Sequence, residues 1–131
     1  MRPRCKLCKQ IIEGSEFTLT NGKKVVPNQN MTCRSIGLIY ILECVSCKKF
    51  YIGSTQNALN LRINLHRDHT RHPERQASLG CNRHFYNCNK NTEIKFRVFP
   101  LKQVNCEHNA IKLRATEDLM IERLKPELNN L

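Results

Sequence analysis

Two pairs of cysteines have the spacing that zinc sites use. Cys5 and Cys8, and again Cys44 and Cys47, are separated by two residues, which lets two neighbouring thiolates bind one tetrahedral Zn²⁺. The 131 residues include eight cysteines, and disulfides explain them less well because we expect no secretory leader. The sequence therefore predicts structural zinc, in closed sites that take no part in catalysis.

A later segment can complete one of these sites. Residues 77–89 carry apolar residues at roughly helical spacing, which places His84 and Cys88 one turn apart on one face. Together with Cys44 and Cys47 they would form a Cys₃His zinc site. The alternative is that Cys88 is a small buried apolar residue and His84 a surface group.

Residues 1–35 are predicted to form a cysteine-rich, zinc-binding extension. Asn21-Gly22 lies between two alternating runs, which predicts a type I′ hairpin around residues 16–26. Such a ribbon is marginal alone, so a zinc ion held by Cys5, Cys8 and Cys33 would anchor it. The fourth ligand stays open between a residue upstream of Met1 and three residues of the chain, namely Cys81, Cys106 and His108.

A second group of residues could act on a phosphate. The helical pattern of residues 57–69 places Arg62 and His66 on one face, and arginine can clamp a phosphate through two hydrogen bonds. Glu117 lies on an otherwise apolar stripe of a helix predicted from about Glu107 to Lys125, so it needs a partner. A cation such as Mg²⁺ or Mn²⁺ would serve and would stabilise the charge of a phosphoryl transition state. The alternative is structural: a surface arginine, a satisfied histidine, and a buried salt bridge from Glu117 to Arg62.

Three strands are expected to position these side chains. Ile36–Leu42 and Phe50–Gly53 flank the polar knuckle that holds Cys44 and Cys47, a pattern typical of a β-hairpin. Ile94–Phe99 alternates apolar and basic residues, and Pro100 should end that strand. His69–Pro73 is expected to be a loop or a frayed helix end. The predicted fold class is α+β, with a small three-stranded antiparallel sheet flanked by helices over residues 36–131.

The two hairpin strands also carry a pair of motifs. Residues 37–40 read GLIY and residues 51–55 read YIGST, and both precede Arg62 and His66. In this order they resemble the GIY-YIG nuclease family, from about Ile36 to Asn129. Compared with the family's pattern, the first motif has one extra residue between Gly and Ile. The spacing from Gly53 to Arg62 is also one residue longer than the commonest spacing in the family. The Cys-x-x-Cys between the motifs resembles the endonuclease domain of Penelope-like retroelements in particular.

The resemblance implies a role for each site residue. Tyr40 would be the base and Tyr51 would position water or phosphate, while Asn129 matches a terminal asparagine of the family. The reference pKa of tyrosine is about 10, so Tyr40 needs a neighbouring cation and a proton acceptor such as His66. The implied activity is metal-dependent cleavage of DNA that leaves a 5′-phosphate and a 3′-hydroxyl. The retroelement likeness implies nicking in the nucleus, to prime a reverse transcriptase domain upstream in the same polyprotein.

The charge of the chain agrees with a nucleic-acid partner. The net charge is +11, and no apolar run is long enough to span a bilayer, so a polyanion is the expected partner. Nucleic acid is the first choice ahead of an acidic membrane surface, and no membrane is among the predicted partners. The residues predicted to contact DNA are Arg67, Arg71, Lys95 and Arg97. One competing function is a non-catalytic, zinc-stabilised nucleic-acid-binding module. Another is a zinc-bridged protein-interaction domain of ubiquitin-ligase type, which leaves the charge and the Arg62, His66 and Glu117 set unexplained.

Overall fold

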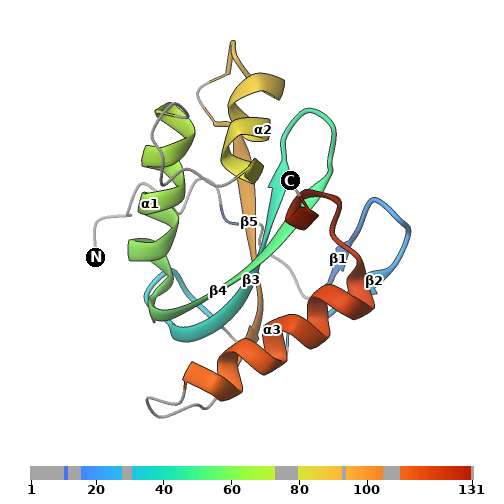
Figure 1. The fold of residues 1–131 in the computed structure, drawn as a ribbon, viewed down its shortest axis with the longest axis vertical. Coiled ribbons are helices and arrows are strands. Elements are labelled where there is room, and N and C mark those ends of the chain that lie inside the picture. The colour runs from blue at the N-terminus through green and yellow to red at the C-terminus, as the bar shows by residue number, and fades with distance from the viewer. Residues whose placement is uncertain are drawn as a thin grey trace.

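A three-stranded antiparallel sheet forms the centre of the molecule (Figure 1). The computed structural model describes residue 11 and residues 16–27, 31–72, 80–92, 94–104 and 110–130. Strand β3 (Ile36–Cys44) lies between β4 (Phe50–Ala58) and β5 (Phe96–Gln103). The predicted α+β fold is confirmed.

Both faces of the sheet are covered, which explains the near-continuous apolar run of β3. Leu38, Tyr40 and Leu42 face one core, which helices α1 (Leu59–Arg71) and α2 (Gly80–Cys88) cover. Ile39 and Ile41 face a second core, covered by helix α3 (Ala110–Leu124). A short 3₁₀ helix, η2 (Glu127–Asn130), follows α3 and contacts β4 and α2. None of the described helices is long and apolar enough to cross a membrane.

The ribbon predicted near residues 16–26 is present and packs on the second core. Strands β1 (Phe17–Thr18) and β2 (Lys24–Val25) pair antiparallel, and the Phe17 ring stacks on Phe99 with 5.0 Å between centroids. The turn differs from the prediction. Gly22 has a φ of 88° but Asn21 is not in the positive-φ region, whereas a type I′ turn needs both. The amide of Leu19 instead donates to the Lys23 carbonyl at 2.8 Å, which closes a three-residue loop. Cys5 and Cys8 lie outside the described residues, and Cys33 is half-buried.

The ends of one helix and one strand also differ from the prediction. Helix α1 continues to Arg71, so His69 and Arg71 are helical rather than part of a loop. Strand β5 continues through Pro100, which was expected to end it. The pairing register of β3 and β5 shifts between Ile39 and Tyr40, beside Pro100, and β5 is an edge strand. A proline is tolerated at such a place because the ladder does not need its missing N–H group.

Candidate active site

Two side chains of helix α1 converge on the hydroxyl of Tyr40. The Tyr40 oxygen lies 2.8 Å from Nε2 of His66 and accepts a hydrogen bond from Nε of Arg62 at 3.2 Å. Arg62 and His66 reach the same atom because they are one helical turn apart. The helix itself is fixed at its start, where the amides of Leu59 and Asn60 donate to backbone carbonyls of residues 35 and 33. The structure therefore brings three of the predicted residues into contact.

Gly53 of the YIG motif gives the Tyr40 ring its space. Gly53 is the cross-strand partner of Tyr40, and a Cβ added there would lie 2.6 Å from the Tyr40 hydroxyl oxygen and 2.7 Å from Cζ. Any other residue would collide with the ring. Tyr51, two residues earlier, lies beside the same histidine, with 5.9 Å between the ring centroids of Tyr51 and His66.

Burial sets the protonation states of this cluster. The Tyr40 side chain has no exposed surface, and burial raises its pKa to about 12, although the charge of Arg62 acts to lower it. Burial also raises the pKa of Tyr51. The pKa of His66 is lowered to about 4 by burial and by the positive charge of Arg62. Near neutral pH the free protein therefore holds a protonated tyrosine against an uncharged imidazole.

Glu117 approaches the cluster from the other side of β4. Its half-buried carboxylate accepts a hydrogen bond from Oγ of Ser54 at 2.5 Å. Although burial is the larger cause, the negative charge of Glu117 also raises the pKa of Tyr40. Ser54 is thus its partner in the structure, where the sequence suggested a cation or Arg62. A single partly exposed carboxylate with room for water is a suitable ligand for Mg²⁺ or Mn²⁺.

Asn129 is fixed against β4 rather than directed at Tyr40. Its side-chain oxygen accepts a hydrogen bond from the Ile52 amide at 2.8 Å, and its nitrogen donates to the Ile52 carbonyl at 2.9 Å. Ile52 is the central residue of the YIG motif, between Tyr51 and Gly53. The amide of Asn129 therefore holds the strand that carries both of those residues.

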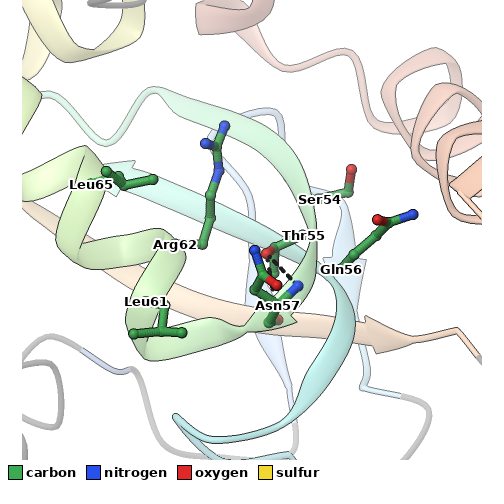
Figure 2. A pocket seen from close by; sticks show the side chains of 7 residues that line it. All are labelled: Ser54, Thr55, Gln56, Asn57, Leu61, Arg62 and Leu65. Carbon is green, nitrogen blue, oxygen red and sulfur yellow. Dashed lines mark hydrogen bonds between the residues drawn. The ribbon is translucent and has the colours of Figure 1, made fainter. Parts of the chain in front are cut away.

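A cleft of about 270 Å³ opens beside Arg62. Figure 2 shows the Arg62 side chain rising between two leucines of α1 and the polar residues of β4. Leu61 and Leu65 are 58% and 49% exposed. The remaining lining residues are Ser54, Thr55, Gln56 and Asn57. An exposed apolar surface next to a cation is the feature that sequence reasoning missed here.

The predicted Cys₃His group is assembled at the tip of the β3–β4 hairpin. Lys48, with a φ of 66°, donates from its amide to the Cys44 carbonyl, and this turn places both hairpin thiols next to α2. The Cys47 sulfur lies 3.2 Å from Nε2 of His84. One ligand atom from each of four residues lies within 4.8 Å of the others, and these residues are Cys44, Cys47, His84 and Cys88. Three thiols and an imidazole fill a tetrahedral shell, so the group suits a structural Zn²⁺.

The four predicted DNA contacts fall in different places. Arg67 and Arg71 lie on α1, the helix of Arg62 and His66. The ammonium of Lys95 donates to the carbonyls of Asn89 and Thr92 at 2.8 and 3.0 Å, so Lys95 also stabilises the loop after α2, and its contact with DNA stays a prediction. Arg97 is exposed and pairs in register with Glu43, which by strand alternation faces away from Tyr40. Cys106 and His108 lie outside the described residues, and Cys81 is buried in the first core.

The comparison with protein families gives a match over most of the chain. The model of the GIY-YIG catalytic domain matches residues 36–129, most of the 131-residue chain. No curated protein and no solved structure matches. The chain belongs to the GIY-YIG family, and membership implies an endonuclease that acts on DNA.

Proposed function

We propose that this GIY-YIG protein is a metal-dependent DNA endonuclease that nicks one strand and leaves a 5′-phosphate and a 3′-hydroxyl. The observation that carries the proposal is the convergence of Arg62 and His66 on the Tyr40 hydroxyl. A net charge of +11 supports binding to DNA, since cationic surfaces gain affinity by releasing counterions from the phosphates.

Arg62 has two tasks in this proposal. In the free protein its Nε group covers a hydroxyl that has no exposed surface. A phosphate in the adjacent cleft would accept two hydrogen bonds from the guanidinium and draw it away from Tyr40. The scissile phosphate would thus uncover the base that acts on it, and the base would stay protected from solvent until DNA is bound.

Water activation would proceed by two proton transfers. The attacking water gives a proton to Oη of Tyr40, and Tyr40 gives its own proton to Nε2 of His66, 2.8 Å away. The resulting hydroxide attacks phosphorus, the bond to the 3′ oxygen breaks, and that oxygen takes a proton from solvent. Positioned proton transfer of this kind contributes a factor of roughly 10² to 10⁴ in rate. The relay avoids a free tyrosinate, which a pKa of about 12 makes rare near neutral pH.

Glu117 is the residue proposed to hold Mg²⁺ or Mn²⁺. When bound, the cation would neutralise charge on the phosphoryl oxygens and on the leaving 3′ oxygen. The hydrogen bond from Ser54 fixes the carboxylate at the edge of β4, close to the proposed position of the phosphate. Zinc is assigned to the Cys₃His group instead, where it would join the hairpin tip to α2 and leave no open position for chemistry.

The cleft beside Arg62 is proposed to hold the DNA strand next to the cut. Gln56 and Asn57 line it with side-chain amides, and Leu61 and Leu65 present an exposed apolar edge. Apolar side chains at such positions can wedge against a base step and distort the strand. Arg67 and Arg71, on the same helix, would contact flanking phosphates.

The retroelement context is part of the proposal. The support is the Cys-x-x-Cys that lies between the two motifs, together with the Cys₃His cluster that it helps to form. In that context the nick would provide the 3′-hydroxyl for a reverse transcriptase domain of the same polyprotein, in the nucleus. The N-terminal zinc site of Cys5, Cys8 and Cys33 likewise stays a proposal.

One observation favours a second function. Because the Tyr40 hydroxyl is fully buried with a raised pKa, the fold could instead serve as a non-catalytic nucleic-acid-binding module. Supercoiled plasmid with Mg²⁺ separates the two functions. The endonuclease converts it to open circles and Glu117→Ala does not, although both bind it; a binding module only retards the plasmid in a gel.

A further inference from the structure

We propose that Asn82 is a positioning residue, which fixes the tautomer of His66 and so leaves Nε2 free to accept the proton of Tyr40. The inference rests on the proposed function for its catalytic consequence, but the tautomer can be measured without any reaction. Asn82 belongs to neither family motif and comes from α2, while His66 comes from α1.

Each nitrogen of the His66 ring has one polar neighbour of its own among the described hydrogen bonds. Nε2 lies 2.8 Å from the Tyr40 oxygen, and Nδ1 lies 3.1 Å from Oδ1 of Asn82. His66 is 1% exposed and Asn82 has no exposed surface, so water does not compete for either contact. A neutral imidazole carries one proton, and the partner of one nitrogen therefore decides the state of the other.

The Tyr40 end of this network requires a bare Nε2. The Tyr40 oxygen already accepts a hydrogen bond from Arg62, and its own proton points to the nearest acceptor, which is Nε2 of His66. If Nε2 carried the proton, two N–H groups would face the Tyr40 oxygen and the hydroxyl proton would lose its acceptor. The cost of such an unpaired buried group is roughly 1 to 3 kcal/mol.

The Asn82 end supplies the hydrogen-bond acceptor that the Nδ1–H tautomer needs. With Oδ1 towards Nδ1, the amide accepts the Nδ1–H bond, while Nδ2 of Asn82 is buried and has no hydrogen-bond partner among the described residues. Reversing the amide would point Nδ2 at the ring and force the proton onto Nε2, where it blocks the relay. The hydroxyl of Thr70 also donates a hydrogen bond to the backbone carbonyl of His66 at 2.7 Å, which holds the backbone of His66 in place.

The consequence for the reaction is a defined path for one proton. Nε2 takes the proton that leaves Tyr40, the ring becomes an imidazolium, and Nδ1–H keeps its bond to Oδ1 of Asn82 throughout. The oxygen of Asn82 then faces a cation, which strengthens that hydrogen bond. Asn82 touches neither substrate nor metal in this scheme.

Nitrogen-15 NMR of the zinc-loaded protein, without DNA or Mg²⁺, tests the tautomer directly. His66→Gln identifies the His66 signals among the five histidines. We expect the Nδ1–H form in the parent and in Asn82→Asp, whose oxygens can only accept, and loss of that preference in Asn82→Leu. An Nε2–H form in the parent would overturn the proposal.

Plasmid nicking tests the catalytic consequence. Asn82→Leu should lower the nicking rate about 10²-fold at unchanged DNA affinity, and Asn82→Asp should restore most of it. Asn60→Leu is the matched control, because it removes another amide with a buried atom that has no partner in the described part of the chain, and it should leave nicking intact. Parental nicking by a folded, zinc-loaded Asn82→Leu would contradict the role. A parent that shows the Nδ1–H tautomer but never nicks would instead count against the proposed function.

Discussion

Gly53 and Tyr40 are partners on neighbouring strands, and they lie so close together that only a hydrogen atom fits on the Cα of residue 53. Any side chain at that position would collide with the tyrosine. A Cβ at position 53 would lie 2.6 Å from the Tyr40 oxygen. The atoms in the way belong to an aromatic ring that is itself fully buried, so the ring cannot move aside without displacing His66 and Arg62.

Gly53→Ala should therefore disable the site while preserving the sheet. We expect nicking to fall about 10²-fold or more, because a misplacement of about 1 Å in a reacting group has an effect of that size. Parallel measurements of nicking rate and of thermal unfolding check this. An active Gly53→Ala protein would show that the Tyr40 hydroxyl has no fixed position in catalysis.

His66 should make the fold sensitive to acid. Its pKa is about 4 in the folded protein against 6.5 when exposed, so below pH 6.5 the unfolded chain binds a proton that the folded chain does not. The resulting stabilisation is present above pH 6.5 and is lost as pH falls towards 4, by up to about 3 kcal/mol. Urea unfolding at several pH values measures it.

His66→Gln is the comparison for that experiment. The variant lacks the titrating ring, so its stability should fall less steeply between pH 6.5 and 5 than that of the parent. Zinc content is measured alongside, because acid also protonates thiolate ligands. Equal slopes for the two proteins at equal zinc content would mean that His66 is not held uncharged in the core.

The Cys₃His group should bind zinc and stabilise the fold. Cys88→Ser removes one of four ligands, so we expect about one zinc ion fewer per chain by elemental analysis and a lower unfolding temperature. Because α2 carries both His84 and Asn82, loss of the ion should also slow nicking. Unchanged zinc content in Cys88→Ser would exclude Cys88 as a ligand.

The exposed edge of the cleft should matter for DNA and not for the fold. Leu65→Ser removes an apolar side chain that is 49% exposed beside Arg62, and Ile111→Ser removes one that is 82% exposed on α3. We expect Leu65→Ser to weaken DNA binding by about 1 kcal/mol or somewhat more, since it removes an apolar contact. Ile111→Ser should bind as the parent does. Fluorescence anisotropy with a labelled duplex measures both, and equal affinities would remove the cleft from the proposed DNA path.

The sequence predicted those parts of the site that depend on local geometry. Arg62 and His66 are one turn apart on a single helix, and Cys44 and Cys47 share one tight turn, so their spacing alone determines how they lie. The order of the two family motifs added Tyr40, which lies on a strand, to the residues of this site. The sheet followed from the lengths and alternation of the apolar runs.

The parts that were missed depend on packing between distant elements. The contact of Asn82 with His66 arises from how α2 lies against α1, and no pattern near residue 82 signals it. Ser54 was part of a motif but its bond to Glu117 joins β4 to α3. The bonds from the Lys95 ammonium to two carbonyls of the preceding loop likewise have no signal in the sequence. Charge and residue type did not indicate which partners were already present within the fold.

The nicking rate of Tyr40→Phe tests the central claim most directly. The substitution removes one oxygen from a buried ring, so fold, zinc content and DNA affinity should stay as in the parent. With supercoiled plasmid and Mg²⁺, we predict a rate at least about 10²-fold below that of the parent, since the water loses its proton acceptor. A folded, zinc-loaded Tyr40→Phe that nicks at the parental rate would contradict the assignment of Tyr40 as the base.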